Sequence, residues 1–590
     1  NLYGLDIDDR AAQLAGFALL MKARADDRRL FNDPPRINVL SLQESKGLDL
    51  DELATHVAPF GVQRATVKAL RDTFEHAKTF GSLIQIPDAL NTQLPTLAEA
   101  LGKANETGDL YAQAAAQDLI PLVEQAQVLG RKFDAVVANP PYMGGKGMNR
   151  ALKEFAKASF PDSKSDLFAM FIERGFAWCK PNGFNSMVTM QSWMFLSSYE
   201  SMRASLLERQ TLACMVHMGN GVMGIAFGTA ATILVNSHVD GYQGSFSYCE
   251  NEDIDENGKP RYFPIKNDRL RTARLNDFKG IPGVPFAYWT SLAFRRVFKF
   301  PLLKTYAVTR EGMVTGNNEL YLRYWHEVAH TNISFDSHNR IEALNSRKRW
   351  FPYIKGGGYR KWSGNREFVV DWQDDGRRIR ETVDVDTGRI RGSKFNLDYI
   401  FKPNVSWSAL NASYFGARLT NGCSLFDSTG PACFPEAEVI HYINGVLNSV
   451  VAVEVLKIIN PTVRFLPGDI GNIPVAKLDD SDLGRIKIIS ARAVSISDED
   501  DFESETSSLF STFPMVRFSE SNLLSAWCRW KQVVEDRESE LLNVEIENNR
   551  ILIKAYGLEG ELSADVPKDQ ITLCKVDREE GVQRLISYAI

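Results

Sequence analysis

The most constraining feature of the sequence is an apolar run, Phe133–Ala138, that leads directly into Asn139-Pro140-Pro141-Tyr142. The apolar run predicts a buried β-strand. Each proline fixes one backbone torsion, so the loop that follows the strand is rigid. Such a loop can direct the side-chain carbonyl of Asn139 and the backbone carbonyl of Pro140 toward a single point.

Two convergent carbonyls are suited to a planar exocyclic amine, which donates one hydrogen to each and turns its lone pair toward an electrophile. Tyr142 offers a ring on which an extruded base can stack, an interaction of roughly 1–3 kcal/mol. The base must be flipped out of its nucleic-acid double helix to reach this position. The motif therefore predicts catalysis by positioning and hydrogen bonding, with Asn139, Pro140, Pro141 and Tyr142 as the catalytic residues. The alternative is a rigid proline turn at a strand end.

Strands and helices alternate over the first third of the chain, which predicts an α/β fold with a mainly parallel, doubly wound sheet. The strands expected besides Phe133–Ala138 are 1–5, 82–86 and 184–190, and the helices expected are 9–24, 66–78, 94–129 and 166–179. After about Pro301, aromatic and glycine-rich segments with short strand signals follow, and a helix is expected within 519–545. At 590 residues the chain exceeds the size of one ordinary core.

The Asn139–Tyr142 motif resembles the fourth motif of N6-adenine methyltransferases, whose Rossmann-like sheet binds S-adenosylmethionine. Gly4-Leu5-Asp6-Ile7-Asp8 resembles the second motif of that family, Phe80-Gly81-Ser82-Leu83-Ile84 the third, and Ser165-Asp166-Leu167-Phe168 the fifth. The resemblance implies that S-adenosylmethionine is bound by Asp6, Ile7, Ser82, Leu83, Asn139 and Asp166. No glycine-rich first motif precedes Asp6, so we expect the chain to lack the natural N-terminal part that carries it.

Further phrases resemble the PglX family of methyltransferases from BREX phage-resistance systems. They are Gly312–Asn318 with Trp325, then 355–365, 447–449, 460–462 and 468–470. This resemblance implies site-specific adenine-N6 methylation that marks host DNA as self, with double-stranded DNA and other BREX proteins as partners. The expected architecture is a Rossmann-like S-adenosylmethionine-dependent catalytic domain in 1–300 without its first motif, a mixed α+β DNA target-recognition domain in 301–480, and a helical C-terminal region in 481–590.

The segment from Arg347 to Trp362 interleaves basic, aromatic and glycine residues, as expected for phosphate contacts. Residues 341–402 hold 14 Lys/Arg against 9 Asp/Glu, although the whole chain has a net charge of −6. The predicted DNA contacts are Arg347, Lys348, Lys355, Tyr359, Arg360, Lys361 and Trp362. The alternative is a solvated loop with some core aromatics. The same charge pattern suggests that a phage-encoded DNA mimic could bind there.

Several other functions are disfavoured by the sequence. Seven scattered cysteines without a Cys-x-x-Cys pair argue against disulfides and a thiolate zinc site, and favour the reducing cytoplasm. The sequence contains no apolar run of about 18 residues, so no membrane span is expected. His326-Glu327 with His330 fits a zinc-protease pattern, but no third ligand follows at a recognisable spacing, so we expect no metal. A type IIG restriction-modification enzyme and a non-catalytic DNA-binding fragment remain as alternatives.

Overall fold

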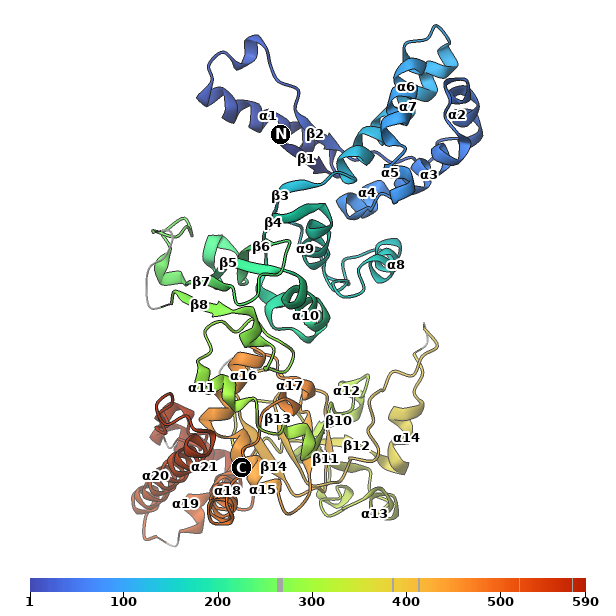
Figure 1. Cartoon of the computed structure of the whole chain (residues 1–590). Helices are drawn as coiled ribbons and strands as arrows, with labels where there is room; N and C mark the ends of the chain where they lie inside the picture. Colours follow the sequence, from blue (N-terminus) through green and yellow to red (C-terminus); the bar gives the residue numbers. More distant parts are fainter. Residues whose placement is uncertain (263–268, 385–386, 412–413, 519, 576) are drawn as a thin grey trace. The chain divides into compact units, whose positions relative to one another are not determined.

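The computed structural model describes residues 1–262, 269–384, 387–411, 414–518, 520–575 and 577–590. The chain divides into two compact units, Asn1–Lys279 (unit 1) and Gly280–Ile590 (unit 2), whose elements are labelled in Figure 1. The division into domains 1–300, 301–480 and 481–590 stays a prediction.

Unit 1 contains a six-stranded sheet in the order β3-β4-β6-β5-β7-β8. The pairs β3–β4 and β5–β7 are parallel, whereas β4–β6, β5–β6 and β7–β8 are antiparallel. The strands are β3 (Phe133–Ala138), β4 (Cys179–Met190), β5 (Thr211–Met218), β6 (Thr229–Val235), β7 (Gln243–Cys249) and β8 (Arg271–Arg274). The predicted α/β class is confirmed, but the sheet is mixed rather than mainly parallel.

The first two strands, β1 (Tyr3–Asp6) and β2 (Asn38–Ser41), form a separate parallel pair. The helix between them, α1 (Asp9–Asp26), matches the predicted helix 9–24 and begins at Asp8, whose side chain accepts a hydrogen bond from the Ala11 amide. The rings of Tyr3 and Phe133 lie 5.4 Å apart. The start of β1 therefore lies beside the start of β3.

Helices of unit 1 enclose an apolar core that includes Val57, Leu70, Leu101 and Leu119. They are α2 (Leu50–Val57), α3 (Arg64–Phe74), α4 (Ala77–Phe80), α5 (Asp88–Asn91), α6 (Leu94–Asn105) and α7 (Leu110–Leu129). Later in the chain come α8 (Arg150–Ser159), α9 (Leu167–Trp178) and α10 (Glu200–Arg209). The prediction of one helix over 94–129 was wrong. Asp109 interrupts it, because its side chain accepts the amides of Tyr111 and Ala112 and starts a new helix.

The predicted strand 82–86 is also wrong. The chain forms a 3-10 helix at Gly81–Leu83 instead, and Gly81 has a φ of +58° that favours glycine. The Arg174 guanidinium of α9 donates to the carbonyls of Ser82 (3.2 Å) and Ile84 (2.8 Å). Those carbonyls accept side-chain hydrogen bonds in place of a strand ladder.

Unit 2 combines two four-stranded sheets with helices. One sheet has the order β10-β12-β11-β15 and the other β14-β13-β16-β9. The strands are β9 (Ala307–Arg310), β10 (Leu322–Tyr324), β11 (Trp350–Ile354), β12 (Phe368–Asp371), β13 (Asn404–Trp407), β14 (Ala417–Thr420), β15 (Leu425–Phe426) and β16 (Ala432–Pro435). This arrangement agrees with the mixed α+β character expected after about Pro301.

The two longest helices that the structure describes in unit 2, α18 (Asp480–Asp501) and α20 (Leu523–Tyr556), lie toward its C-terminal end. The described helices of this unit are α11 (Leu292–Val297), α12 (Asn318–Tyr321), α13 (Arg340–Asn345), α14 (Gln373–Glu381), α15 (Ile440–Leu447), α16 (Val450–Ile459), α17 (Pro467–Gly471), α18, α19 (Pro514–Arg517), α20 and α21 (Arg578–Ala589). In the part of the chain that the structure describes, no single helix is long and apolar enough to cross a membrane. The pair α15 and α16, bent by 68°, passes that test by length and composition only.

A buried ion pair joins the glycine-rich loop of unit 2, residues 355–367 between β11 and β12, to helix α20. The ammonium of Lys361 contacts the Glu545 carboxylate, and their side chains are 8% and 1% exposed. The second carboxylate oxygen accepts the indole N–H of Trp362 at 2.7 Å. Beside this pair, Arg360 of the same loop contacts Asp500 at the end of α18 at 3.0 Å. These contacts hold the loop between the sheets and the C-terminal helices.

We expect Glu545→Gln to lower the free energy of unfolding of unit 2 by about 3–5 kcal/mol, because it leaves Lys361 charged and buried without a counter-ion. The matched control is Glu547→Gln on the same helix, since Glu547 pairs with Arg485 at the surface with side chains 43% and 54% exposed. That control is expected to cost less than about 1 kcal/mol. Urea unfolding of the two variants measures the difference, and equal losses would contradict a structural role for the buried pair.

Candidate active site

The loop Asn139–Tyr142 lies at the carboxyl end of β3, beside β4. The Tyr142 hydroxyl lies 3.3 Å from the Asn139 side-chain oxygen and 3.4 Å from the carbonyl of Val188 on β4. Asn139 is exposed and Pro140 is buried. Burial raises the pKa of Tyr142 above its usual value, which keeps its hydroxyl protonated. The Asn139 carbonyl is therefore fixed in direction and still accessible.

A second aromatic side chain faces Tyr142. The ring of Phe227 lies 5.7 Å from the Tyr142 ring at an interplanar angle of 67°. The ring of Phe168 lies 6.1 Å from the Tyr142 ring in an edge-to-face arrangement. Phe227 is 38% exposed. It was missed in the sequence, where its only signal is an isolated aromatic among glycines just before β6. Tyr142 and Phe227 together offer two rings to a flat ligand.

The segment that carries Phe227 is held by Gln191 and His217. The backbone N–H of Gln191 donates to the Gly228 carbonyl at 3.0 Å. A Cβ on Gly228 would come within 2.4 Å of the Gln191 side chain. The Gln191 amide oxygen contacts Nε2 of His217 at the end of β5. Burial lowers the pKa of His217 to about 4, so the ring is neutral at pH 7 and its Nε2–H donates to Gln191.

Asp166 joins the loop to helix α9. Its carboxylate accepts the amide of Met143 at 2.9 Å and the amide of Phe168 at 3.3 Å. Leu167 in turn donates its amide to the Met143 carbonyl at 3.2 Å. Burial raises the pKa of Asp166, and the amides of Met143 and Phe168 act in the opposite direction. Asp166 is thus an N-cap of α9 that also fixes the end of the Asn139–Tyr142 loop.

The segments that resemble the second and third motifs lie next to each other. The ammonium of Lys78 donates to the Ile7 carbonyl at 2.8 Å and to the Asp9 carboxylate at 2.9 Å. A Cβ on Gly81 would meet Ile7 at 3.7 Å. Asp6 is half-buried at the end of β1, and one of its oxygens accepts the Asp8 amide at 2.9 Å. A carboxylate so placed fits a ribose diol.

The other residues predicted to bind the cofactor differ in exposure. Leu83 is 1% exposed, so its side chain belongs to the core beneath the segment. Ser82 is half-buried, and its carbonyl is taken by Arg174. Arg174, which the sequence analysis missed, also donates to the Leu129 carbonyl at 3.1 Å and lies over the Trp178 ring. Burial lowers the pKa of Arg174 to about 10, still far above neutrality.

The residues predicted to contact DNA fall into two groups. Arg360, Lys361 and Trp362 are engaged by Asp500 and Glu545 inside unit 2, as described above, and the ring of Tyr359 faces Tyr414 at 5.4 Å. The structure gives this first group an internal role. The second group is nearer solvent: Arg347 is exposed, Lys348 donates to the Thr331 carbonyl, and Lys355 lies over the Phe368 ring at 5.2 Å.

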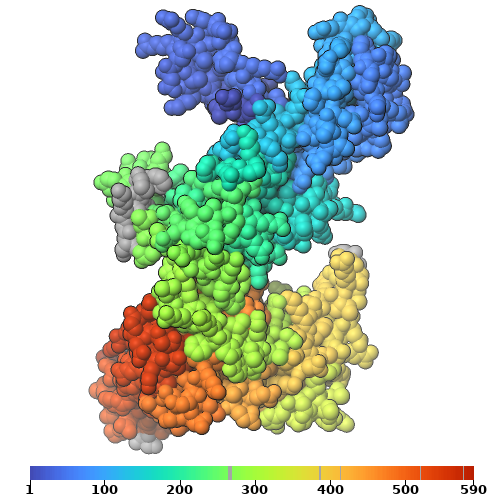
Figure 2. Space-filling view, in the orientation of Figure 1, coloured from blue at the N-terminus to red at the C-terminus, as the bar shows by residue number. Residues whose placement is uncertain are grey.

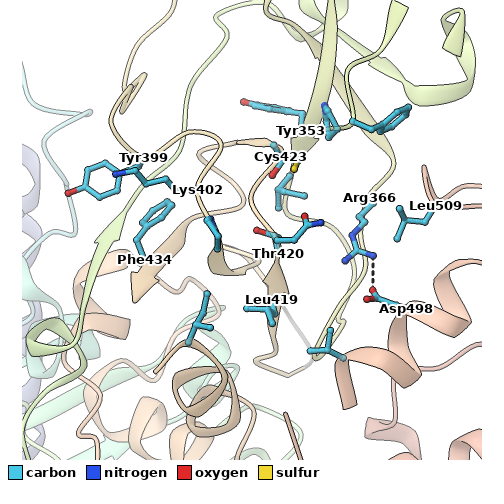
Figure 3. A pocket seen from close by; sticks show the side chains of 18 of the residues that line it. Tyr353, Arg366, Tyr399, Lys402, Leu419, Thr420, Cys423, Phe434, Asp498 and Leu509 are labelled. Atoms are coloured by element: carbon cyan, nitrogen blue, oxygen red, sulfur yellow. Dashed lines mark hydrogen bonds and ion pairs between the residues drawn. The ribbon is translucent and has the colours of Figure 1, made fainter. Parts of the chain in front are cut away.

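A cavity of about 1120 Å³ lies within unit 2 and is lined by residues of both sheets and of α18. Figure 3 shows Arg366 on one side of it, bonded to Asp498, with Tyr399 and Lys402 on the other. The Arg366 guanidinium also contacts Asp501 at 3.3 Å. Of the residues predicted for catalysis, cofactor or DNA, none lines this cavity.

The His-Glu-x-x-His pattern does not form a zinc-protease helix. His326 lies in a 3-10 helix at Trp325–Glu327 and His330 in another at His330–Asn332. The two imidazoles therefore do not lie one turn apart on an α-helix, as that pattern requires. Among the described residues, no group of three or more His, Cys, Asp or Glu is placed to hold a metal ion.

Comparison with known proteins finds close sequence relatives. Residues 1–223 match the Eco57I restriction-modification methylase family. The chain is 38% identical over 639 residues to the adenine-specific methyltransferase BrxX of Escherichia coli O9:H4 (strain HS), covering 100% of this chain and 51% of BrxX. It is 31% identical over 612 residues to the adenine-specific methyltransferase PglX of Lacticaseibacillus casei (strain Zhang), covering 100% of this chain and 50% of PglX. The chain thus spans about half the length of these curated relatives.

Among solved structures, the chain is similar to the Type IIL restriction-modification enzyme MmeI in complex with DNA. The TM-score is 0.46 and the sequence identity 11%, over 98% of this chain and 78% of that chain.

We expect Asp166→Ala to lower the free energy of unfolding by about 1–2 kcal/mol, since α9 loses its N-cap, and to speed hydrogen exchange at the Met143 amide. Asp166→Asn keeps an acceptor oxygen and removes the buried charge, so it should remain close to the unsubstituted protein. Urea unfolding and hydrogen-exchange mass spectrometry measure both effects. If the asparagine variant were as damaged as the alanine variant, the charge rather than the hydrogen bonds would hold the loop.

We expect the stability of unit 1 to fall as the pH is lowered from 6.5 to about 4. In this window the unfolded chain protonates His217, whose ordinary pKa is 6.5, while the folded chain keeps the ring neutral down to about 4. The total loss from this group is roughly 3 kcal/mol. His217→Gln should flatten this part of the pH profile of unfolding, and an unchanged profile in that variant would show that other groups cause it.

Proposed function

We propose that the whole protein, as a member of the family of adenine-specific methyltransferases that includes BrxX and PglX, transfers a methyl group to the N6 amine of adenine in DNA. The observation that carries the proposal is the Asn139–Tyr142 loop at the end of β3, with a hydrogen-bonded Asn139 carbonyl beside the ring of Tyr142. A second ring, Phe227, lies edge-to-face with Tyr142, with centroids 5.7 Å apart and ring planes at 67°.

In the proposed mechanism, the Asn139 side-chain oxygen and the Pro140 carbonyl each accept one hydrogen of the adenine amine. These bonds orient the nitrogen lone pair. The face of Tyr142 stacks on the extruded base, and Phe227 adds an apolar ring beside it. S-adenosylmethionine, when bound, supplies an electrophilic methyl group attached to sulfur. Transfer of that methyl group would leave a surplus proton on the amine, which would pass to water. Asn139 and Pro140 act by position, so no side chain has to remove a proton first.

The cofactor side of the site would be formed by Asp6 and Ile7, the 81–83 segment and Asn139. The fit rests on the half-buried Asp6 carboxylate at a strand end and on the contact between Ile7 and Gly81. We assign Asp6 to the ribose hydroxyls. Leu83 and Asp166 support this site from within, because Leu83 is buried and the Asp166 oxygens hold backbone amides.

The proposed substrate is double-stranded DNA with a short asymmetric site that marks host DNA in a BREX defence system. Other BREX proteins are the proposed partners, in the cytoplasm, and a phage-encoded DNA mimic is a proposed inhibitor. Unit 2 would hold the duplex. Of the residues predicted to contact it, Arg347, Lys348 and Lys355 keep groups near solvent, whereas Arg360, Lys361 and Trp362 are occupied inside the unit.

We expect Asn139→Ala in the intact gene product to lower the rate of DNA methylation by about 100-fold or more, because one of two bonds that orient the amine is lost. Phe227→Ala should weaken the capture of the extruded base, by roughly 1–3 kcal/mol. Modification-sensitive sequencing of genomic DNA and turnover with a methyl-labelled cofactor are the measurements.

The matched control is Asp134→Asn, a change on the same strand at a side chain that is 88% exposed. It should methylate normally. If the unsubstituted protein bound DNA but produced no N6-methyladenine, a DNA-binding module without catalysis would replace the methyltransferase proposal. Methylation that survives in Asn139→Ala would show that the catalytic residues lie elsewhere.

A further inference from the structure

On one surface of unit 2, four arginines share ion pairs with two aspartates. This surface lies around helices α13 and α14, the start of β11 and the end of β12, and Figure 2 shows this part of the chain in yellow-green and yellow at the surface of the unit. We define the arginine surface as Arg340, Arg349, Arg378 and Arg380 with the two carboxylates that hold them, Asp371 and Asp375.

Asp371, the last residue of β12, holds two arginines. Its carboxylate contacts the Arg349 guanidinium at 3.0 Å and also that of Arg378 from α14. The aspartate is 1% exposed, while the two arginine side chains are 44% and 47% exposed. The buried carboxylate therefore fixes two guanidinium groups whose outer parts face solvent.

Asp375 repeats this arrangement four residues later. It accepts Nε of Arg340 at 2.9 Å and a second bond from the same guanidinium, and it contacts Arg380 at 2.7 Å. Arg340 and Arg380 are 37% and 35% exposed. The next charged pair along the helix, Arg377 with Glu381, is balanced one to one.

Asp371 and Asp375 thus each hold two guanidinium groups with one negative charge, and Asp398 is a further negative charge near Arg340. A guanidinium has five N–H donors, so each arginine keeps donors that the aspartates do not use. Arg366 in the cavity of Figure 3 shows the opposite balance, since two carboxylates, Asp498 and Asp501, surround one guanidinium. The whole chain has a net charge of −6, so the local positive charge of the arginine surface marks it as a site for an anion.

We propose that the arginine surface binds the phosphate backbone of duplex DNA, a role that rests on the proposed function. Planar guanidinium forks match phosphate oxygens, and the two aspartates hold the forks in place before binding. Because phosphate contacts position a duplex without reading its sequence, the surface sets affinity and register, not the choice of site. Arg347 and Lys348 extend it beyond α13.

The test removes one arginine from each aspartate. Arg378→Gln with Arg380→Gln leaves Asp371 paired with Arg349 and Asp375 paired with Arg340, so no carboxylate is stranded and the fold is preserved. The matched control is Arg485→Gln with Arg492→Gln, which changes the charge equally at arginines that pair with Glu547 and Glu540. Thermal unfolding by circular dichroism checks that both variants are folded.

The measurement is the dissociation constant of the intact gene product for a fluorescent DNA duplex over a series of salt concentrations. Losing two phosphate contacts should lower the slope of log Kd against log salt by about 1.8 and weaken binding more than about tenfold at about 0.1 M salt. The control should keep both values. Arg378→Lys with Arg380→Lys, which retains the charge, should recover most of the slope.

An unchanged slope in Arg378→Gln/Arg380→Gln, or an equal loss in the control, overturns the arginine surface while DNA binding by the chain, and with it the proposed function, still stands. Failure of the unsubstituted intact gene product to bind DNA at any salt concentration overturns both.

Discussion

Helix α9 is the element on which the candidate site depends, because it carries two buried polar side chains that hold other segments. At its start, Asp166 accepts the amide that follows the Asn139–Tyr142 loop. Near its end, the Arg174 guanidinium donates to three carbonyls, including those of Ser82 and Ile84. Burying such a group without hydrogen bonds would cost several kcal/mol, so the segments that supply the carbonyls are held in one arrangement.

The parts of the fold that follow from neighbouring residues were predictable from the sequence. The strand Phe133–Ala138 was predictable from its apolar run, but the prediction that it is buried was wrong, since its residues are half-buried or exposed and Val137 is 79% exposed. The helices near 9–24 and 166–179 follow from apolar residues at helical spacing and from the caps Asp8 and Asp166. The rigid Asn139–Tyr142 loop follows from two prolines. These features need no information from distant parts of the chain, and they sufficed to predict the α/β class and the position of the Asn139–Tyr142 loop at a strand end.

The features that the sequence did not reveal depend on partners far along the chain. The 82–86 segment has the composition of a strand, but Arg174, about 90 residues later, takes its carbonyls. Lys361 and Trp362 have the composition of a nucleic-acid contact, but Glu545 lies 184 residues from Lys361 and engages both. Phe227 joins Tyr142 only because β6 and β4 are paired. A basic or aromatic residue shows its role only when its neighbours in space are known.

The contact between Lys361 and Glu545 also has a consequence for biosynthesis. Since a ribosome makes the chain from its first residue, unit 1 can complete its core before unit 2 has been translated, as domains generally fold in order of synthesis. Unit 2 must wait for α20, because until Glu545 leaves the ribosome Lys361 has no counter-ion. The nascent protein can thus complete the Asn139–Tyr142 loop before Glu545 is translated, and the loop that carries Lys361 becomes fixed only after that point.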